Sequence, residues 1–401
     1  MTKIVIIGCG DAGLSAASSA SRQDRSAEIT VISKEDSVYP RCPLPYFIGG
    51  QVSESDLVRP LSRMFSGSNI QVVIDEAVEI GGSSVKCLAN DLPFDKAILA
   101  TGGTAKCVGG SLTLRSMEDA RKIKSRAQEK EPTIIGGGML GCELADMLGG
   151  TILEREDRIL SAFDPDFSEM IEQALLDKGV KIITGSKKSS SSPFPISSIG
   201  VSPDVGLAKK SGIKTSEFGI KVDKDLLTNR KHVYAAGDCI EERCFLTGKP
   251  MHSYLGPQAE REGTIAGINA AGGKMHYKGS LNSVVAKIAG IEIGRTGLCS
   301  MDAKEACEDM TIGKVRVRTK PDYFPGVGEL TIKMIFGGKN LVGCQAIGDE
   351  SVDGIINLAS YAMQHGAKVD DLINLDYCYS PPICSAPNPV ILCAQNAKRR
   401  M

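Results

Sequence analysis

The chain has 401 residues, with 47 basic and 48 acidic side chains and a formal net charge of −1. This balance argues against broad binding to nucleic acids or acidic membranes, and the 42% hydrophobic content excludes disorder for most of the chain. At about 150 residues per domain, two or three domains are expected. The N-terminal apolar run is short and lacks a signal-peptide cleavage site, and no run reaches the ~18 apolar residues of a membrane span. We therefore expect a cytoplasmic protein.

The first predicted elements form a βαβ unit. Residues 4–7 are typical of a buried parallel strand, 14–21 of a helix and 28–32 of the next strand. The motif GCGDAG at 8–13 joins the first strand to the helix, where glycines allow a tight turn, close approach of a pyrophosphate to the backbone, and close helix packing. The acid expected about 20 residues later is displaced, and Glu35 is the nearest candidate. The residues of this unit predicted to bind a dinucleotide are Gly8, Gly10, Asp11, Ala12, Gly13 and Glu35.

A cysteine flanked by prolines follows this unit, in the segment VYPRCPLPYFIGG. Arg41 precedes Cys42, and a neighbouring guanidinium favours a thiolate, so we expect a lowered thiol pKa and a reactive nucleophile. The usual alternative for a cysteine is a small buried hydrophobic residue. We expect that role for most of the other twelve cysteines, including Cys9 and Cys142 inside the glycine motifs.

A second βαβ unit repeats the first. It consists of strand 133–135, the motif GGGMLG at 136–141, helix 142–148 and strand 151–153. Glu154 closes the last strand, where a carboxylate accepts a hydrogen bond from a ribose 2′-OH and repels a 2′-phosphate, so NADH is favoured over NADPH. Gly141 and Glu154 are 13 positions apart, against about 18–20 in an intact unit, so the helix has lost about a turn. The predicted nicotinamide-dinucleotide residues are Gly136, Gly138, Gly141 and Glu154.

The rest of the chain extends the first unit and then changes character. In order, we predict strand 97–100, a helix over 117–128, a polar loop at 187–193, strand 233–235, a helix over 258–271, strands 284–288, 329–334 and 341–347, and helices 352–364 and 369–372. The part after residue 283 therefore indicates an α+β domain. Residues placed after strand ends and assigned to cofactor binding are Thr101, Gly102, Gly237 and Asp238.

The histidines and one pair of cysteines give weaker indications of function. The histidines are scattered, and no spacing indicates a metal site, so structural roles are expected for His232, His252, His276 and His365. Cys239 and Cys244 form a C-x4-C pair that allows a labile disulfide, although two buried thiols are the favoured interpretation.

Taken together, these motifs resemble the FAD-dependent pyridine nucleotide-disulfide oxidoreductases, in particular the single-cysteine branch of CoA-disulfide reductases, NADH oxidases and peroxidases, and persulfide reductases. The matching pieces run along essentially the whole chain: GCGDAG, YPRCPLPYFIGG, ILATGG, IIGGGMLGCE, VYAAGDC, LVGCQAIGDESVDGIINLASYAMQHG and YSPPICSAPNPV. The resemblance implies an α/β fold with two Rossmann-like dinucleotide-binding domains and a C-terminal α+β dimerisation domain. The implied boundaries are 1–110 with 222–282 for FAD, 111–221 for a shortened NAD(P) domain, and 283–401 for dimerisation.

The resemblance also implies roles for individual residues. FAD belongs at the first glycine motif, with Asp238 on its ribityl or phosphate side and Arg41 close by. Cys42 is the redox thiol, because the second cysteine of a dithiol mechanism would fall at Phe47. Tyr379 stands where the reductases of this branch place a tyrosine that reaches the partner's active site; packing in the domain core is its alternative. Cys378 and Cys384 border the same segment, where a relay to Cys42 is a further possibility.

Three departures from the family pattern bear on function. Asp11 replaces the histidine that oxidases and peroxidases carry in the first motif, which weakens those two readings. The NAD unit is shortened, and the hairpin expected before ISSIGVSP is replaced by KKSSSSPFP. We therefore expect weak or altered nicotinamide binding.

The predicted function is an FAD-dependent NAD(P)H:disulfide oxidoreductase, in which Cys42 reacts with a small disulfide or persulfide of the CoA-disulfide type. The alternatives are an NADH oxidase in which the cysteine cycles through sulfenic acid, a flavoprotein fed by a non-nicotinamide donor, and a flavin-binding sensor without turnover. The predicted partners are the small sulfur substrate and a second copy of the chain, with neither nucleic acid nor membrane.

Overall fold

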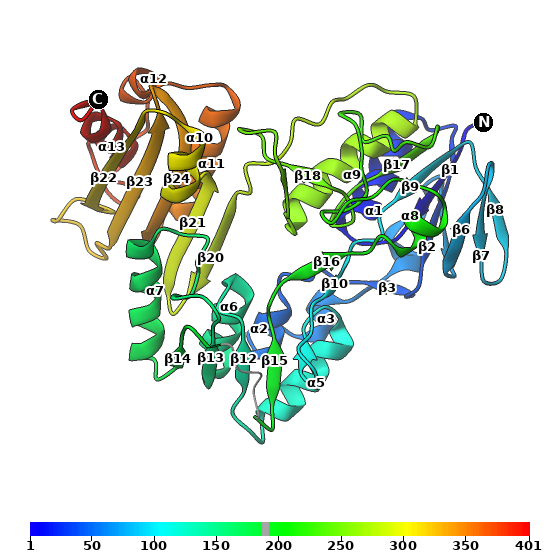
Figure 1. Cartoon of the computed structure of the whole chain (residues 1–401), viewed down its shortest axis with the longest axis horizontal. Coiled ribbons are helices and arrows are strands. Elements are labelled where there is room, and N and C mark those ends of the chain that lie inside the picture. The colour runs from blue at the N-terminus through cyan, green and yellow to red at the C-terminus, as the bar shows by residue number, and fades with distance from the viewer. Residues whose placement is uncertain (187–191) are drawn as a thin grey trace.

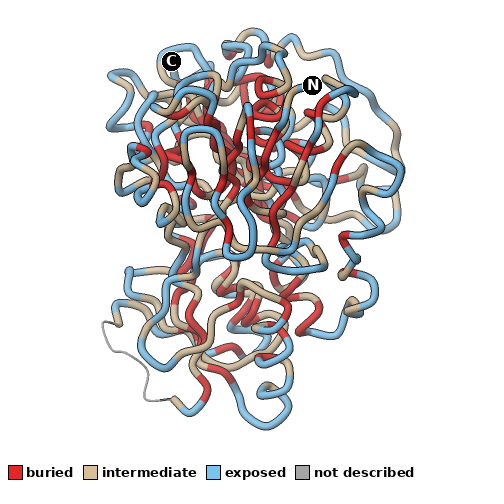
Figure 2. Tube along the Cα trace, turned by 90° about the vertical axis from the view of Figure 1, so that its right-hand side faces the viewer, coloured by how far each residue is buried: buried red, intermediate tan, exposed pale blue. Residues whose placement is uncertain are grey.

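The computed structural model describes residues 1–186 and 192–401. Within them the strands build three five-stranded sheets, each in its own part of the molecule (Figure 1). Buried segments follow the inner strands and exposed loops surround them (Figure 2). In these ranges no helix combines the length and apolar character needed to cross a membrane.

The first sheet is parallel and draws on two distant stretches of chain. Its order is β17–β9–β1–β2–β5, with bounds Val233–Ala235, Lys96–Leu99, Lys3–Ile7, Glu28–Ser33 and Ile70–Ile74. Ile4 and Val5 are neighbours that point to opposite faces of the sheet, and both are buried, so this strand is covered on both faces. Strand β5 was not predicted from the sequence.

Two helices, α1 (Asp11–Gln23) and α9 (Gly256–Ala270), cover one face of this sheet and lie against each other (Figure 1). Their axes approach closely because glycine and alanine face one another. A Cβ on Gly263 would lie 2.1 Å from the Ala12 carbonyl oxygen, and one on Gly267 would lie 2.3 Å from that of Ala16. Both helices begin earlier than predicted, α1 by three residues and α9 by two.

Short elements complete this part of the molecule. An antiparallel sheet, missed in the sequence, is formed by β6 (Ala77–Ile80), β7 (Ser84–Cys87) and β8 (Asp91–Pro93). The others are β3 (Ser37–Val38), β4 (Arg59–Pro60), α4 (Leu61–Met64), β10 (Gly103–Ala105), β16 (Val201–Pro203), α8 (Gly206–Lys210), β18 (Glu242–Arg243) and β19 (Pro250–Met251). Helices α2 (Leu44–Ile48) and α3 (Glu54–Leu57) come from the same stretch of chain but pack against the second unit (Figure 1).

The second sheet is also parallel, in the order β11–β15–β12–β13–β14. Its bounds are Leu112–Thr113, Pro195–Ser197, Thr133–Ile135, Thr151–Leu153 and Lys181–Ile183, and its helices are α5 (Met117–Ala127), α6 (Met139–Leu148) and α7 (Pro165–Asp177). Helix α6 has 10 residues against 13 in α1, as the shortened spacing predicts. Most of the predicted polar loop at 187–193 lies outside the described residues.

The third sheet is antiparallel, in the order β20–β21–β24–β23–β22. Its bounds are Val284–Ile288, Ile291–Gly297, Asn340–Gly348, Glu329–Gly337 and Met310–Arg318, with helices α10 (Ser300–Ala306), α11 (Val352–Gln364), α12 (Val369–Ile373) and α13 (Pro389–Lys398). Alternate residues of β23, such as Ile332 and Met334, pack with residues of α11 and α13 in one buried cluster. Their neighbours, such as Lys333, face the opposite way, toward α7.

A row of polar side chains joins this sheet to α7 of the second unit. Arg295, Gln345, Lys333 and Lys314 are paired in register across the four strands β21, β24, β23 and β22. The Nζ atom of Lys333, a buried residue, lies 2.8 Å from Asp164 and 2.5 Å from Asp166. Gln345 accepts a 2.9 Å hydrogen bond from the Asp164 backbone. The start of α7 is therefore docked on the third sheet by charge.

Candidate active site

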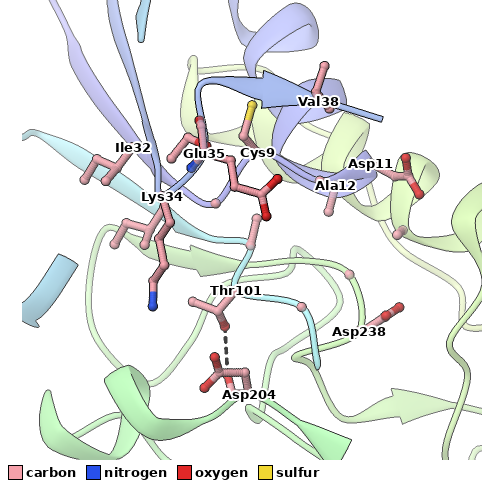
Figure 3. Close-up of a pocket in the computed structure, with 18 of the residues that line it drawn as sticks. Cys9, Asp11, Ala12, Ile32, Lys34, Glu35, Val38, Thr101, Asp204 and Asp238 are labelled. Carbon is pink, nitrogen blue, oxygen red and sulfur yellow. Dashed lines mark hydrogen bonds between the residues drawn. The ribbon is translucent and has the colours of Figure 1, made fainter. Parts of the chain in front are cut away.

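A cavity of about 590 Å³ opens at the carboxyl ends of the first sheet's parallel strands (Figure 3). Ligands of open parallel sheets bind at this edge, because the connecting loops converge there. The cavity gathers most of the residues predicted for the first cofactor and the thiol: Gly8, Gly10, Asp11, Ala12, Glu35, Arg41, Cys42, Thr101, Gly102, Gly237 and Asp238. Gly13 lies behind the loop, where a Cβ would be 2.0 Å from the Gly8 oxygen, so its role is packing.

The first glycine loop has the geometry of an anion site. Gly8 has φ = 108°, and a Cβ there would lie 2.2 Å from the Ala100 carbonyl oxygen, so only glycine fits. The N-cap of α1 is Gly10, and within the described part of the chain no side chain caps this helix. Its first N–H groups thus face the cavity, as the pyrophosphate of a dinucleotide requires. The loop, the volume of the cavity and the acidic residues that line it, among them Glu35 and Asp238, fit FAD.

An ion pair on the cavity wall was missed by the sequence reasoning. Arg115 Nη2 lies 2.5 Å from Asp238 Oδ2, and its Nε donates to the Gly103 oxygen at 3.1 Å. Both side chains are largely buried. The nearest sequence signal was the capping box Ser116–Asp119 that begins α5 directly after this arginine. Nothing in the sequence linked it to an aspartate 123 positions away.

The other wall-forming contacts are shown in Figure 3. Glu35 and Asp11 lie at different places around the cavity, and the Thr101 hydroxyl donates to the Asp204 carbonyl oxygen at 2.7 Å. Cys9 also lines the cavity and is half-buried, and burial raises its thiol pKa to about 12. The expectation of a fully buried Cys9 is therefore wrong, whereas Cys142 is buried as expected. Asp204 was missed in the sequence.

Cys42 lies just before α2 and beside the first turn of α1. A Cβ on Gly256 would lie 3.9 Å from its Sγ and 3.1 Å from Asp11 Oδ2, so thiol and carboxylate meet over the start of α9. The pKa of Cys42 is raised, first by loss of hydration and then by the negative charges of Asp11 and Glu143. The prediction of a lowered pKa is wrong for these surroundings. Arg41 turns away and donates from Nε to the Arg115 carbonyl oxygen at 3.2 Å.

A half-buried carboxyl group of the second unit completes the surroundings of the thiol. Helices α2 and α6 face each other, with Gly49 against Met147 and Tyr46 against Glu143. The Tyr46 hydroxyl donates to Glu143 Oε1 at 3.3 Å. Burial raises the pKa of Glu143 to about 7, and the charge of Asp146 adds to it while the tyrosine opposes it. The sequence reasoning assigned no role to Tyr46 or Glu143, although Glu143 stands at the end of the quoted motif IIGGGMLGCE.

The second glycine loop is built like the first but lies apart from this cavity. Gly136 has φ = 106°, and a Cβ on Gly141 would lie 2.0 Å from the Gly136 oxygen. Glu154 accepts hydrogen bonds from the backbone N–H of Gly137 at 2.6 Å and of Glu156 at 2.8 Å. Among the described residues that line the cavity, none comes from the predicted nicotinamide set Gly136, Gly138, Gly141 and Glu154.

The C-terminal candidates lie far along the chain and on the surface. Tyr379 is 47% exposed and its hydroxyl lies 3.4 Å from that of Tyr323, so the alternative of a tyrosine packed in the core is wrong. Cys378 is exposed and Cys384 is half-buried. Of the described residues lining the cavity, none belongs to this segment. In the C-x4-C pair, Cys239 is buried, Cys244 is half-buried, and both thiols are free.

Comparisons with known proteins agree along the whole chain. Residues 2–193 and 194–263 match the pyridine nucleotide-disulphide oxidoreductase family, and residues 285–389 match the dimerisation domain of that family. An NADH oxidase of Methanocaldococcus jannaschii is 32% identical over 448 aligned positions, covering 100% of this chain and 99% of the relative. An NAD(P)H coenzyme A polysulfide/persulfide reductase of Pyrococcus horikoshii is 27% identical, covering 99% of this chain and 98% of the relative.

Solved structures give the same result. An NAD-dependent persulfide reductase from A. fulgidus superposes with a TM-score of 0.94 at 30% identity, covering 99% of this chain and 83% of the other. The reduced CoADR-RHD of Bacillus anthracis superposes with a TM-score of 0.93 at 25% identity, covering 99% and 80%. The predicted arrangement of two Rossmann-like domains and a C-terminal α+β domain is thus confirmed.

Proposed function

The chain belongs to the pyridine nucleotide-disulphide oxidoreductase family, and from this premise we propose that it reduces a small disulfide or persulfide through Cys42, with electrons from NAD(P)H. Bound FAD supplies the passage of an electron pair from the nicotinamide to the cysteine sulfur. The thiolate of Cys42 attacks a sulfur of the substrate and forms a mixed disulfide.

One observation carries the assignment of a single-cysteine mechanism. The position of a second active-site cysteine is Phe47, a buried side chain of α2 that packs in the core of the second unit. An internal disulfide with Cys42 is therefore impossible at this position. The sulfur that pairs with Cys42 has to come from the substrate, and Cys42 is exposed to receive it.

We assign FAD to residues 1–110 with 222–282, and the nicotinamide dinucleotide to 111–221. In the first part the N-terminus of α1 would hold the pyrophosphate, and Glu35 and Asp238 would bind hydroxyl groups in the cavity. In the second part the Glu154 carboxylate would bind a ribose. It already accepts hydrogen bonds from backbone N–H groups of its own loop, which fix its position. The family's use of FAD and NAD(P)H supports both assignments.

A homodimer completes the proposal. The chain carries a dimerisation domain, and we assign the contact to residues 283–401. Tyr379 is exposed on this domain, away from the cavity of its own chain, which suits a residue that completes the partner's site. Cys384 lies in the same segment and would approach the same site.

An NADH oxidase is the second candidate, because the 32% identical relative from Methanocaldococcus jannaschii is named as one. In that reaction Cys42 would be oxidised to a sulfenic acid and reduced again. Against it stands the carboxylate of Asp11 next to the thiol, where an imidazole of the oxidase type is missing.

The deciding experiment is anaerobic mixing of the FAD-loaded protein with NADH and then with NADPH, while the flavin absorbance is followed. Bleaching is expected, and re-oxidation by CoA disulfide or a persulfide should outpace re-oxidation by oxygen. Faster re-oxidation by oxygen would establish the oxidase instead. Absence of bleaching by either nucleotide at millimolar concentration would contradict both and favour a non-nicotinamide donor or a sensor.

A further inference from the structure

Two carboxyl groups are buried next to each other behind the wall of the cavity. Glu242, at the start of β18, is 3% exposed, and Glu262, in the middle of α9, is 1% exposed. One amide group bridges them, because Gln258 Nε2 lies 2.6 Å from Glu242 Oε2 and 2.7 Å from Glu262 Oε1. Arg261 holds the amide in this orientation by donating from Nη2 to its oxygen at 2.8 Å. Glu242 and Glu262 are called the buried carboxyl pair below.

One member of the pair holds a turn of the cavity wall. Glu262 Oε2 accepts a 2.7 Å hydrogen bond from the backbone N–H of Gly237. Gly237 has φ = 83°, and a Cβ on it would lie 2.8 Å from the Cβ of Ala12, so the turn fits tightly against α1. Gly237 and the next residue, Asp238, both line the cavity assigned to FAD. Glu262 therefore fixes, from behind, the part of the wall that bears Asp238.

The hydrogen bonds assign different charge states to the two carboxyl groups. Glu242 accepts from three donors in the described chain: the Tyr277 hydroxyl at 2.6 Å, the Arg243 backbone N–H at 2.6 Å, and the bridging amide. Glu262 accepts from two, the bridging amide and the turn. Donors stabilise an anion, and two buried anions next to each other repel. Glu242 is therefore the anion, and Glu262 is a neutral acid that donates its proton to Glu242.

The surroundings of the pair favour a single shared proton. Burial raises the pKa of Glu262 well above the ordinary glutamate range, and the charge of Glu242 and the hydrogen bond with it add to the rise. Burial and the charges of both carboxyl groups also raise the pKa of Tyr277, so its hydroxyl remains a donor. The other charged or titratable groups packed around the pair are Arg261, Cys239, Glu241 and Arg243. Both of these arginines are engaged outside the pair, one with the bridging amide and one with Glu241.

We propose that Glu262 is a positioning residue for FAD binding, which holds the cavity turn in place only while it shares its proton with Glu242. Loss of this proton to water leaves two anions next to each other in a buried space, and their repulsion moves the Glu262 carboxylate away from the Gly237 N–H. The turn then no longer fixes Asp238, and FAD is released. FAD binding is therefore complete while the pair is protonated and weakens as the pH rises. This goes beyond disulfide reduction, because it makes retention of the cofactor depend on pH.

The test follows FAD release from the full-length, FAD-loaded protein as the pH is raised above neutral, with flavin fluorescence as the readout. The wild type should bind FAD about tenfold more weakly once the pair has lost its proton. Glu262→Gln cannot ionise, and it keeps an oxygen for Gly237 and an N–H for Glu242. It should bind FAD within about twofold of the wild type at neutral pH and lose the pH dependence. Glu262→Leu leaves the Gly237 N–H without its acceptor and should bind FAD about tenfold more weakly at every pH. The matched control is Glu260→Gln, an exposed residue of the same helix, which should behave as the wild type.

A wild type whose FAD affinity is the same at neutral and alkaline pH would overturn the proposal, and so would a pH dependence that persists in Glu262→Gln. Equal loss of FAD from Glu262→Gln and Glu262→Leu at neutral pH would also overturn it, because the neutral acceptor would then not suffice. Glu242→Gln likewise leaves at most one charge in the pair and provides the same test if Glu262→Gln does not fold. FAD release is measured without NADH or a disulfide, so these outcomes are independent of the proposed disulfide reduction.

Discussion

Loss of hydration and then two nearby carboxyl groups raise the pKa of the Cys42 thiol. Asp11 comes from the first turn of α1, and Glu143 reaches across from α6 of the second unit. Glu143 has a pKa raised to about 7 by burial, so its charge changes in the physiological range. Above that pH it becomes an anion and raises the thiol pKa further. Cys42 is thus least acidic on the alkaline side of neutrality.

Replacing Glu143 by glutamine should make Cys42 more reactive, because the variant loses the charge and keeps the hydrogen-bond acceptor for Tyr46. We expect the Cys42 pKa to fall and the rate of iodoacetamide alkylation at pH 7.5 to rise several-fold. The pH profile of alkylation of the FAD-loaded protein measures this. The control Glu169→Gln, on the exposed side of α7, should leave the profile unchanged. An unchanged Cys42 pKa in Glu143→Gln would show that the two groups do not interact.

Cys42→Ser should separate cofactor binding from chemistry. The cavity is formed by many backbone groups, so the variant should retain FAD, while disulfide reduction should fall by at least about 10³-fold because the nucleophile is lost. Flavin content and NADH-dependent thiol release are the measurements. Wild-type turnover in the serine variant would falsify the assignment of the redox centre.

At the scale of elements, the shortened helix α6 sets the expectation for the nicotinamide. Helix α6 has three residues fewer than α1, which corresponds to roughly 4.5 Å of helix. This moves the helix N-terminus relative to the first cofactor, so we expect weak nicotinamide binding. A Kd for NADH in the low micromolar range, measured by flavin-quenching titration, would contradict this.

The choice between NADH and NADPH should follow from Glu154 and its neighbour. Glu154 repels a 2′-phosphate, and Arg155 is held by Glu156 Oε1 at 2.8 Å rather than free to bind one. We expect up to about a tenfold preference for NADH in kcat/KM. Glu154→Gln should remove most of the preference, and Glu156→Gln should improve NADPH by releasing Arg155. A clear preference of the wild type for NADPH would disprove the role of Glu154.

The predictability of these elements depended on how local their signals are. The strands of residues 4–7 and 133–135 and both glycine loops were found because apolar runs and glycine spacing lie within a few residues. Helix α7 was missed although Asp164 and Pro165 mark its start and Phe167, Ile171 and Leu175 repeat every fourth residue. The two-residue strands β3, β4, β18 and β19 were missed because so short a run carries no periodicity.

In the candidate site, too, residues with local sequence signals could be predicted and residues that meet through long-range contacts could not. Most motif residues could be placed in one cavity, because they stand at the ends of predicted strands. The Arg115–Asp238 pair and the approach of Glu143 to Cys42 could not, because these residues meet only after the two units have packed together. The predicted effect of Arg41 failed for a related reason. Adjacency in sequence does not say where a side chain points, and Arg41 points to a carbonyl.

At the scale of the whole molecule, a buried charge holds the second unit to the third sheet. Burial alone would raise the pKa of Asp164, but hydrogen bonds from Lys333 and Ser300 outweigh it and lower the pKa. The contribution to stability is therefore complete above the ordinary pKa of 3.8 and is lost as the pH falls through the lower, folded-state value.

Lys333→Met should destabilise this contact strongly, because it leaves Asp164 and Asp166 without their shared cation. We expect a loss of about 3 kcal/mol, seen as a lower thermal unfolding midpoint at pH 7. Lys314→Met is the matched control: its Nζ is more exposed and contacts Asp166 alone, so a smaller loss is expected. The difference between the two variants should shrink as the pH falls below 3.8, where Asp164 and Asp166 take up protons. Equal midpoints at pH 7 would contradict the role given to Lys333.

The proposed dimer can be examined by sedimentation velocity at micromolar concentration, where a dimer should be the main species. Tyr379→Phe should leave the sedimentation coefficient unchanged and slow disulfide reduction, if the tyrosine completes the partner's site. A fully active monomer would exclude this arrangement.

The order of strands in the first sheet has a consequence for synthesis on the ribosome. Strand β17 pairs with β9 and carries the Gly237–Asp238 turn of the cavity, yet it is translated more than 130 residues after β9. Until then β9 is an open edge, and exposed edges recruit other strands. The nascent chain must therefore wait for the whole second unit to emerge before its first domain can close and capture a flavin. Cells starved of riboflavin should accumulate this protein bound to chaperones. In these cells the N-terminal part should be the last part of the chain to become resistant to proteolysis.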